Sequence, residues 1–382
     1  MNFELTDDQK MIRQAVRDFA EREIAPLAQQ LDEKAEFSPE LTRKMGELGL
    51  FGMYLPEKYG GQNMDTLAYI IAVEEIARID GSQAATLAAH NSLGIGPIYY
   101  YGTEEQKQKY LPRLCTGEAL WGFGLTEPEA GSDSRGTKTN AIPDGDYWII
   151  NGSKIFITNG SANISIGSSV QTVTKTLDDG RKEYTTFIVE KGTPGFKRVT
   201  MHGKMMWRAS DTAELYFDDC RIPKENLLGK VGEGSKIMLS TLDNGRLSIA
   251  AMGLGAAQGA FELAMKYAQE RRQFGKPISK FQINAFKLAD MATKIEHARW
   301  FLYRACWLKD NQQPFGKEGA MAKLYCSEVA REVADEAVQI HGGYGLMKDY
   351  PIERIYRDQR LLQIGEGTSE IQRLVISRHL GL

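Results

Sequence analysis

Apolar residues recur at helical spacing through the first third of the chain. After a capping box formed by Thr6 and Gln9, the apolar positions are Ile12, Ala15, Val16, Phe19 and Ala20. A second capping box at Thr103 and Gln106 predicts another helix start. The small apolar residues of 82–101 predict a helix that is buried on all sides. With a further helix over 39–48, residues 1 to about 115 are predicted to be helical.

The pattern changes at about Leu120, where short runs rich in β-branched and aromatic residues replace the helical period. These runs cover 147–150, 154–158, 185–190 and 214–217, and turn residues such as Asn151-Gly152 and Asn159-Gly160 separate them. Such runs, bounded by turns, are typical of antiparallel strands. The sequence therefore predicts a middle β domain over 119–231, preceded by a helical domain over 1–118.

Long helical patterns return from about Gly232. They cover 235–272, 281–310 and 317–340, and a final helix is predicted over 369–380. Three or four long antiparallel helices indicate an up-down bundle over 232–382. The predicted fold class is thus mainly α, with a middle antiparallel β domain between a helical domain and a four-helix bundle.

Composition narrows the class of protein. The 382 residues are 42% hydrophobic and 25% charged, and the net charge of −3 gives no support to binding of nucleic acid or anionic membrane. The four cysteines and five histidines are scattered without metal-ligand spacing. No apolar run approaches about 18 residues and no targeting signal is visible, so we expect a cytoplasmic protein without a metal or a membrane span.

One carboxylate stands between two glycines near the C-terminus. The residues are Ile364-Gly365-Glu366-Gly367-Thr368, directly before the final predicted helix. Glycines allow other groups to approach the backbone on both sides of Glu366, and a carboxylate held in this way suits proton abstraction. A surface acid in a glycine turn has the same sequence pattern.

Four further motifs carry candidate chemistry. They are Phe123–Asp133 (FGLTEPEAGSD), Phe156–Gly160 (FITNG), Glu270–Lys276 (ERRQFGK) and Gln339–Gly345 (QIHGGYG). The first can cradle phosphate or a heteroaromatic edge, the second offers an aromatic face beside a hydroxyl, and the third offers guanidiniums beside an aromatic ring. An ordinary loop, a core phenylalanine, a cationic helix end and a tight helix stop are the respective structural alternatives.

Two other patterns concern the long helix predicted from residue 235. Asp243 and Arg246 share a helix face, so they form either a local ion pair or a clamp for a charged ligand. Residues 253–259 nearly match a dinucleotide fingerprint, but no strand precedes them and the spacing of the last glycine is wrong. There is no Walker A sequence, so neither a Rossmann fold nor a P-loop is expected.

Six motifs in this order resemble the acyl-CoA dehydrogenase flavoproteins. The motifs are LTEPEAGSD, KIFITNG, ASDTAELYFDDCRIP, ERRQFGKPI, QIHGGYG and IGEGTSEIQR, and the resemblance covers the chain from about Leu5 to the C-terminus. It implies an N-terminal helical domain, a middle β domain and a C-terminal four-helix bundle, with FAD bound between them. It also implies a homotetramer in which one subunit completes the FAD site of its neighbour.

The resemblance implies a set of binding residues. Residues along the flavin would be Phe123, Leu125, Thr126, Ser132, Phe156 and Thr158, and Thr368 and Glu370 would also touch the cofactor. The neighbouring subunit would supply Arg271, Phe274, Gln282, Gln339, Gly342 and Gly343. Asp243, Arg246 and Ser132 would face the acyl-CoA. The family often has tryptophan at the position of Phe156 and phenylalanine at that of His341.

The implied reaction is α,β-dehydrogenation of an acyl-CoA thioester. Glu366 would take the α proton, and FAD would accept the β hydrogen as hydride at N5. Some members carry their glutamate in the long helix instead, at the position that is Gly245 here. Electron-transferring flavoprotein would reoxidise the flavin. A flavin oxidase that uses oxygen and a non-catalytic flavoprotein partner on the same fold are the alternatives.

The acyl chain is the least defined feature. Trp207 and Tyr344 are bulky, and we expect them to crowd the acyl end. That would favour short, branched or cyclic acyl groups over long ones. The direction of net flux is open.

Overall fold

The computed structural model describes residues 4–382, so the first three residues of the predicted 1–118 domain lie outside it. The N-terminal helices begin where the capping boxes predict: Thr6 caps the first and Thr103 the last. They are α1 (Asp7–Phe19), α2 (Ala25–Lys34), α3 (Pro39–Glu47), α4 (Thr66–Ala77), α5 (Gly81–Ala89), α6 (Gly96–Tyr101) and α7 (Glu104–Leu114). The single buried helix predicted over 82–101 is wrong in one respect, because a π-helical segment, His90–Ile95, separates α5 from α6.

The middle region forms one twisted sheet. Its strands are β1 (Leu120–Gly124), β2 (Asn140–Asp144), β3 (Tyr147–Thr158), β4 (Ser165–Thr176), β5 (Lys182–Glu190), β6 (Phe196–Thr200), β7 (Thr212–Pro223) and β8 (Leu227–Leu228). The strand order is β6-β7-β3-β2-β4-β5-β8. Most pairs are antiparallel, as predicted, but β1 joins β4 in parallel and β2 makes one parallel pairing with β4.

The predicted turn at Asn151-Gly152 is wrong. Residues 147–158 form a single strand, and the register against β7 shifts between Ile150 and Gly152. A Cβ on Gly152 would lie 2.5 Å from Thr139 Oγ1, so glycine allows a close approach there. An Asn-Gly pair inside a strand pattern is compatible with a β-bulge as well as a turn. The bulge lets β3 continue to Phe156 and Thr158.

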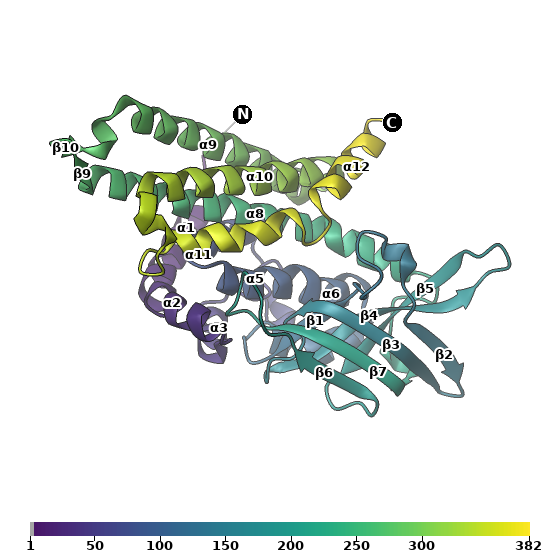
Figure 1. The fold of residues 1–382 in the computed structure, drawn as a ribbon. Coiled ribbons are helices and arrows are strands. Elements are labelled where there is room, and N and C mark those ends of the chain that lie inside the picture. The colour runs from purple at the N-terminus through teal and green to yellow at the C-terminus, as the bar shows by residue number, and fades with distance from the viewer. Residues whose placement is uncertain (1–3) are drawn as a thin grey trace.

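The C-terminal region is a bundle of long helices. It contains α8 (Gly234–Glu270), α9 (Gln282–Asp310), α10 (Gly316–His341), α11 (Ile352–Asp358) and α12 (Ser369–His379). A short hairpin, β9 (Arg272–Gln273) and β10 (Lys276–Pro277), joins α8 to α9. This hairpin projects at the end of the bundle remote from the sheet (Figure 1).

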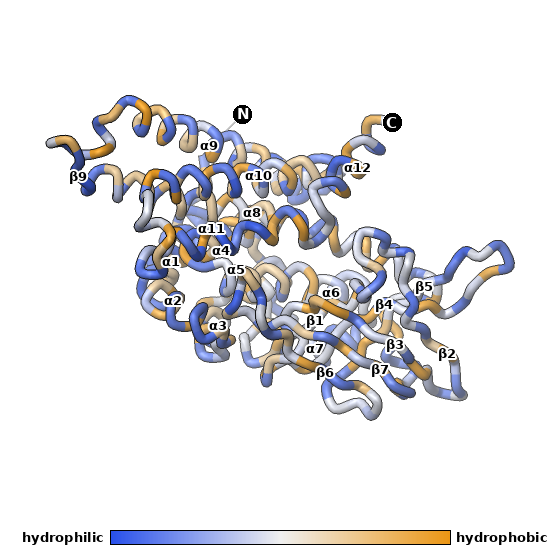
Figure 2. Tube along the Cα trace, viewed as in Figure 1, coloured by the Kyte–Doolittle hydropathy of each residue, from blue (hydrophilic) through white to orange (hydrophobic). Residues whose placement is uncertain are grey.

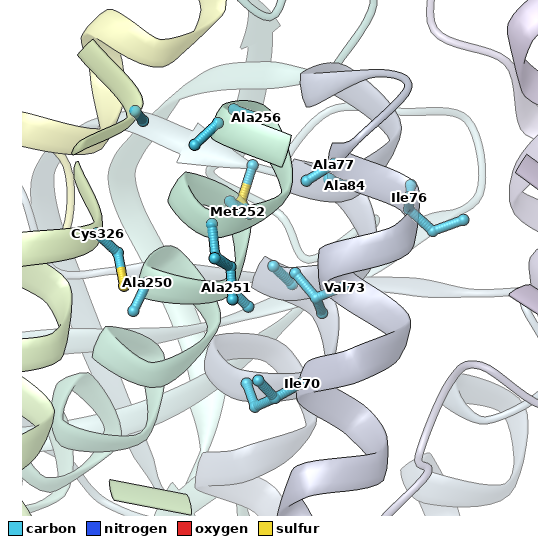
Figure 3. Packing of buried hydrophobic residues seen from close by; sticks show 14 of the residues in the cluster. Ile70, Val73, Ile76, Ala77, Ala84, Ala250, Ala251, Met252, Ala256 and Cys326 are labelled. Carbon is cyan, nitrogen blue, oxygen red and sulfur yellow. The ribbon is translucent and has the colours of Figure 1, made fainter. Parts of the chain in front are cut away.

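Helix α8 forms the centre of the main hydrophobic core. In Figure 3 the apolar side chains of α4 face those of α8, among them Ile70, Val73, Ala77, Ala251 and Met252. A Cβ on Gly255 would lie 2.2 Å from Glu74 O, and one on Gly259 would lie 2.1 Å from Arg78 O. The glycines within residues 253–259 therefore let the backbone of α8 lie close to that of α4.

By length and composition alone, α8 is long and apolar enough to cross a membrane. In the most apolar 18-residue stretch of α8, 78% of the stretch is buried inside the fold. That burial is typical of the central helix of a protein core, where all faces contact other elements. The apolar faces of α8 are covered by the neighbouring helices, chiefly α4 and α10.

Candidate active site

Glu366 lies in a strained turn directly before α12. Its φ is 52°, which is uncommon for a residue with a Cβ, and Gly367 follows with φ 93°. Thr368 caps α12, because its side chain accepts a hydrogen bond from the Ile371 N–H at 3.3 Å. Backbone strain of this kind costs roughly 1–3 kcal/mol and persists only where surrounding contacts fix it.

The carboxylate of Glu366 points against the backbone of α8. A Cβ on Gly245 would lie 1.8 Å from Glu366 Oε2 and 3.2 Å from Leu93 Cδ2. Glu366 Oε2 is buried and has no hydrogen-bond partner among the described residues. Burial raises the pKa of Glu366 to about 7, although the cations of Lys323 and Arg246 oppose that rise.

Two cations flank this carboxylate. Arg246 is buried on α8 and forms an ion pair with Asp243, so the predicted local pair is present. Lys323 of α10 is fully buried, and its Nζ donates to the Gly367 carbonyl at 2.6 Å. Lys323 was not among the sequence candidates, since a lysine in an amphipathic helix pattern normally lies on the solvated face.

The side chains that line this part of the site were also missed. Tyr69 of α4 is buried, and its hydroxyl donates to Ala88 O at 3.1 Å. Burial raises the pKa of Tyr69, and the nearby Glu366 carboxylate adds to the rise. Leu93, which is half-buried, stands in the π-helical segment. The sequence shows only an apolar stretch there, although π-helical turns are frequent at functional sites.

The loop after β1 is fixed to the sheet by a buried ion pair. Glu127 Oε1 accepts from Lys154 Nζ at 2.8 Å, and the Ile155 N–H donates to Thr126 O at 3.0 Å. Phe123 and Leu125 are buried in a small cluster with Met238 of α8, against which Leu93 also packs. The loop candidates therefore join the Glu366 region through Leu93, while Ser132 lies exposed farther along the loop.

A second group of candidates stands apart from these. Phe274 at the tip of the β9–β10 hairpin is 92% exposed, and Arg271 and Gln282 are exposed beside the same hairpin. Gln339, Gly342 and Gly343 are exposed at the end of α10, where the two glycines have nothing within 4 Å of a Cβ position. The hairpin and the sheet lie at opposite ends of the chain's fold (Figure 1). One chain therefore does not bring the two groups of candidates together.

Trp207 and Tyr344, which are expected to crowd the acyl end, lie in two different parts of the fold. Trp207 is buried, and its backbone N–H donates to Asp358 Oδ1 at 2.7 Å. Tyr344 lies near the hairpin, with the Arg271 guanidinium 5.5 Å from its ring. His341 stacks on Tyr267 with ring centroids 4.4 Å apart, which gives that departure from the family pattern a packing role. Tyr69 and Leu93 lie near Glu366, in addition to Lys323 and Arg246.

Three family models match almost the whole chain. They describe the acyl-CoA dehydrogenase N-terminal, middle and C-terminal domains, and they match residues 6–118, 122–220 and 232–381 respectively. The chain belongs to the acyl-CoA dehydrogenase family. This acyl-CoA dehydrogenase is an oxidoreductase and a flavoprotein, and the family resemblance carried by the six motifs is confirmed.

Curated relatives extend over the full chain. A probable acyl-CoA dehydrogenase of Bacillus subtilis is 52% identical and covers 100% of both chains. The short-chain specific acyl-CoA dehydrogenase of Clostridium acetobutylicum is 47% identical over 99% of both. The acryloyl-CoA reductase (NADH) of Anaerotignum propionicum is 46% identical, covering 100% of this chain and 96% of its own.

Solved structures share the fold. Butyryl-CoA dehydrogenase of Megasphaera elsdenii is 44% identical, with a TM-score of 0.96 and 100% coverage of both chains. A chain from a study of the electron transferring flavoprotein of Acidaminococcus fermentans is 49% identical, with a TM-score of 0.96 and coverage of 100% and 99%. An acyl-CoA dehydrogenase of Bacillus anthracis complexed with FAD is 36% identical, with a TM-score of 0.92 and coverage of 99% of this chain and 68% of its own.

The cofactor of this acyl-CoA dehydrogenase is FAD, and the end of β3 has the chemistry to receive a flat ring. Phe156 is 63% exposed with φ 62°, an unusual state for a large aromatic side chain. Thr158 is half-buried two residues later, and Thr126 is half-buried on the adjoining loop. An exposed aromatic side chain, with a threonine two residues later and another on the adjoining loop, has the groups that an amphipathic ring system needs.

Proposed function

We propose that this enzyme removes the α proton of a short-chain acyl-CoA thioester, with Glu366 as the base, to give the 2-enoyl-CoA. The observation that carries the proposal is the Glu366 carboxylate, which has a buried oxygen without a partner and a pKa raised to about 7. A base acts best when its pKa lies near the working pH. Bound FAD would supply the acceptor for the β hydrogen.

The chain's own residues would assist in three ways. Burial strengthens Glu366 as a base, and substrate that excludes more water would strengthen it further. The turn at Gly365 and Gly367 leaves the Glu366 backbone accessible, so we propose that its N–H donates to the thioester oxygen.

We propose that Asp243, Arg246 and Ser132 hold the acyl-CoA, and that Thr368 and Glu370 lie against the cofactor. The dipole at the start of α12 favours the ionised carboxylate. Burial, which raises the pKa, outweighs the opposing charges of Lys323 and Arg246.

The decisive experiment is Glu366→Gln. The substitution keeps the size of the side chain but removes its basic lone pair, so we expect flavin reduction to slow by about 100-fold to 10,000-fold. FAD content and acyl-CoA binding should be retained. Stopped-flow absorbance at the flavin band, with saturating substrate and no oxygen, measures the rate. Reduction within a few-fold of the wild-type rate would refute the assignment of the base.

A short acyl chain is proposed on two grounds. The short-chain specific relative is 47% identical, and the butyryl-CoA dehydrogenase structure is 44% identical. In this chain, Tyr69 and Leu93 occupy space beside Glu366. A panel of thioesters from four to twelve carbons, scored by anaerobic flavin bleaching, should give the fastest reduction with the shortest. Faster reduction with twelve carbons than with four would contradict the proposal.

We propose a homotetramer in which Arg271, Phe274, Gln282, Gln339, Gly342 and Gly343 complete the FAD site of a neighbour. Support comes from their exposure and their distance from the sheet, and from the apolar residues exposed on α9, including Ile283, Phe286 and Trp307. In Figure 2 these outer helices alternate between hydrophobic and hydrophilic colours. Without a neighbouring subunit, these large apolar side chains of α9 would be exposed to water.

The test compares two arginines of the same hairpin. Arg271→Ala should weaken FAD retention, whereas Arg272→Ala should not, because Arg272 donates locally to Gly275 O at 3.0 Å. Light scattering of both variants reports the oligomeric state, and the absorbance ratio at the flavin and protein bands reports FAD content. A monomer that retains full FAD would refute this arrangement.

We propose electron-transferring flavoprotein as the electron acceptor, supported by the 49% identical chain from the Acidaminococcus fermentans study. Reoxidation by that carrier should be much faster than reoxidation by air. Rapid peroxide formation with substrate and oxygen alone would indicate an oxidase instead. The 46% identity to an acryloyl-CoA reductase (NADH) motivates a third assay, which follows consumption of a 2-enoyl-CoA when the flavin is first reduced.

A further inference from the structure

Lys323 is a charged side chain in an unusual place. It lies on α10, is 0% exposed, and is among the largest fully buried side chains of the described residues. Its Nζ donates to the carbonyl of Gly367, the residue directly after Glu366, at 2.6 Å. Burial of an ammonium is costly unless it is paired with an opposite charge. A single backbone carbonyl does not offset that cost.

Gln372 of α12 shares the same acceptor. Its Nε2 donates to Gly367 O at 2.9 Å and to Glu366 O at 3.3 Å, and the side chain is 0% exposed. Two buried donors thus converge on the carbonyls of a turn in which Glu366 has φ 52°. The two donors differ in one property, since only Lys323 carries a charge.

The titratable groups around Glu366 come from four elements. Lys323 is on α10, Arg246 and its partner Asp243 are on α8, Tyr69 is on α4, and Glu370 is on α12. Burial lowers the pKa of Lys323 to about 8, while the Glu366 carboxylate acts to raise it. Arg246 already has Asp243 as an ion-pair partner. Among the ion pairs of the described residues, none includes Lys323. Its ammonium is therefore a cation beside the turn that has no carboxylate in direct contact.

We propose that Lys323 is a positioning residue for the base: its ammonium fixes the Gly367 peptide and favours the ionised form of Glu366. The inference rests on the proposed role of Glu366 and extends it. A neutral donor such as Gln372 can hold the turn, but only a cation can stabilise the carboxylate that must accept the α proton. The site thereby keeps a desolvated base that still ionises near neutral pH.

The test uses two matched substitutions. Lys323→Met and Gln372→Met each remove one donor to Gly367 O, but only the first removes a charge. The rate of anaerobic flavin reduction is measured with saturating substrate from pH 5.5 to 9. Lys323→Met should move the pH midpoint upward by about one unit, a tenfold change in the ionisation of Glu366. Gln372→Met should slow the reaction without moving the midpoint.

Two further arms keep the test decisive. Lys323→Gln retains a donor without the charge, so its midpoint should also rise; it replaces Lys323→Met if that variant fails to retain FAD. Binding of a non-oxidisable thioester analogue over the same pH range gives a readout that does not need turnover. An unchanged midpoint in both lysine variants, or an equal shift in Gln372→Met, would overturn the inference.

Failure of the inference differs from failure of the proposed function. If Glu366→Gln abolishes reduction while the lysine variants keep the wild-type midpoint, only the role of Lys323 is refuted. If Glu366→Gln reduces its flavin at nearly the wild-type rate, the base assignment itself fails, whatever the lysine variants show.

Discussion

Two buried carboxyl groups in this protein have similar acidity and very different surroundings. The pKa values of Glu366 and Asp358 are both raised to about 7, in each case chiefly by burial. Asp358 Oδ1 accepts from the Trp207 N–H at 2.7 Å, and its neighbour Asp80 forms an ion pair with Arg354 at 3.3 Å. Glu366 has a buried oxygen without a partner. A raised pKa therefore marks burial, and the unoccupied hydrogen-bonding capacity marks the candidate base.

The backbone makes the same distinction. Asp358 ends the regular helix α11, whereas Glu366 has a positive φ in a turn held by Lys323 and Gln372. Strain fixed by its surroundings is frequent at functional sites. Asp358 instead ties α11 to the loop that contains Trp207, so we assign it a structural role.

After Glu366→Gln itself, the largest expected effect comes from Gly245→Ala. The added methyl would lie 1.8 Å from Glu366 Oε2, so the carboxylate must move. A misplacement of this size can cost about 100-fold in the rate of flavin reduction. Alanine also favours a helix over glycine, so the fold should be retained. Asn244→Ala, the adjacent position of α8, is the control. An unchanged rate in Gly245→Ala would show that Glu366 does not depend on this contact.

The pH profile should separate the two carboxyl groups. If Glu366 is the base, as proposed, it acts when ionised, so the rate of flavin reduction should rise about tenfold for each pH unit below 7 and level off above it. Asp358→Asn keeps an acceptor for the Trp207 N–H and should leave the midpoint unchanged. A midpoint that moves in Asp358→Asn would show that the two sites are coupled.

Asp358→Ala should instead lower stability. At pH 6 Asp358 is mostly protonated, so alanine removes a hydrogen-bond acceptor with little change of charge. The buried Trp207 N–H would then lack a partner, at a cost of about 1–3 kcal/mol. Thermal unfolding at pH 6, compared with Asp358→Asn, measures this difference. Equal melting temperatures for the two variants would argue against the hydrogen bond as the cause.

The smallest effect concerns stability at alkaline pH. A carboxyl group whose folded pKa is raised contributes stability at low pH that is lost as the pH rises through that value, here about 7. Glu366→Gln and Asp358→Asn should therefore each raise the melting temperature relative to wild type more at pH 8 than at pH 5. Only Glu366→Gln should also abolish flavin reduction. A gain that does not depend on pH would contradict ionisation as its source.

Local patterns were sufficient to predict most of the helices, whereas the predicted strand runs correspond only to β3, β5 and β7. The capping boxes at Thr6 and Thr103 place two helix starts, and the helical period gives α8 to within two residues at each end. These features depend on neighbours within four residues, which is the range that a sequence pattern records. The Asn151-Gly152 turn failed for the same reason, because pairing with β7 converts that site into a bulge.

What the sequence determined by itself is the family, the order of the elements and the presence of Glu366 between two glycines. The tertiary structure decided what surrounds that carboxylate. Tyr69, Leu93, Gly245 and Lys323 come from four separate segments, and no spacing in the chain relates them. A side chain's burial and pKa depend on every element packed against it, so the chemistry of Glu366 follows from long-range contacts that a local pattern does not contain.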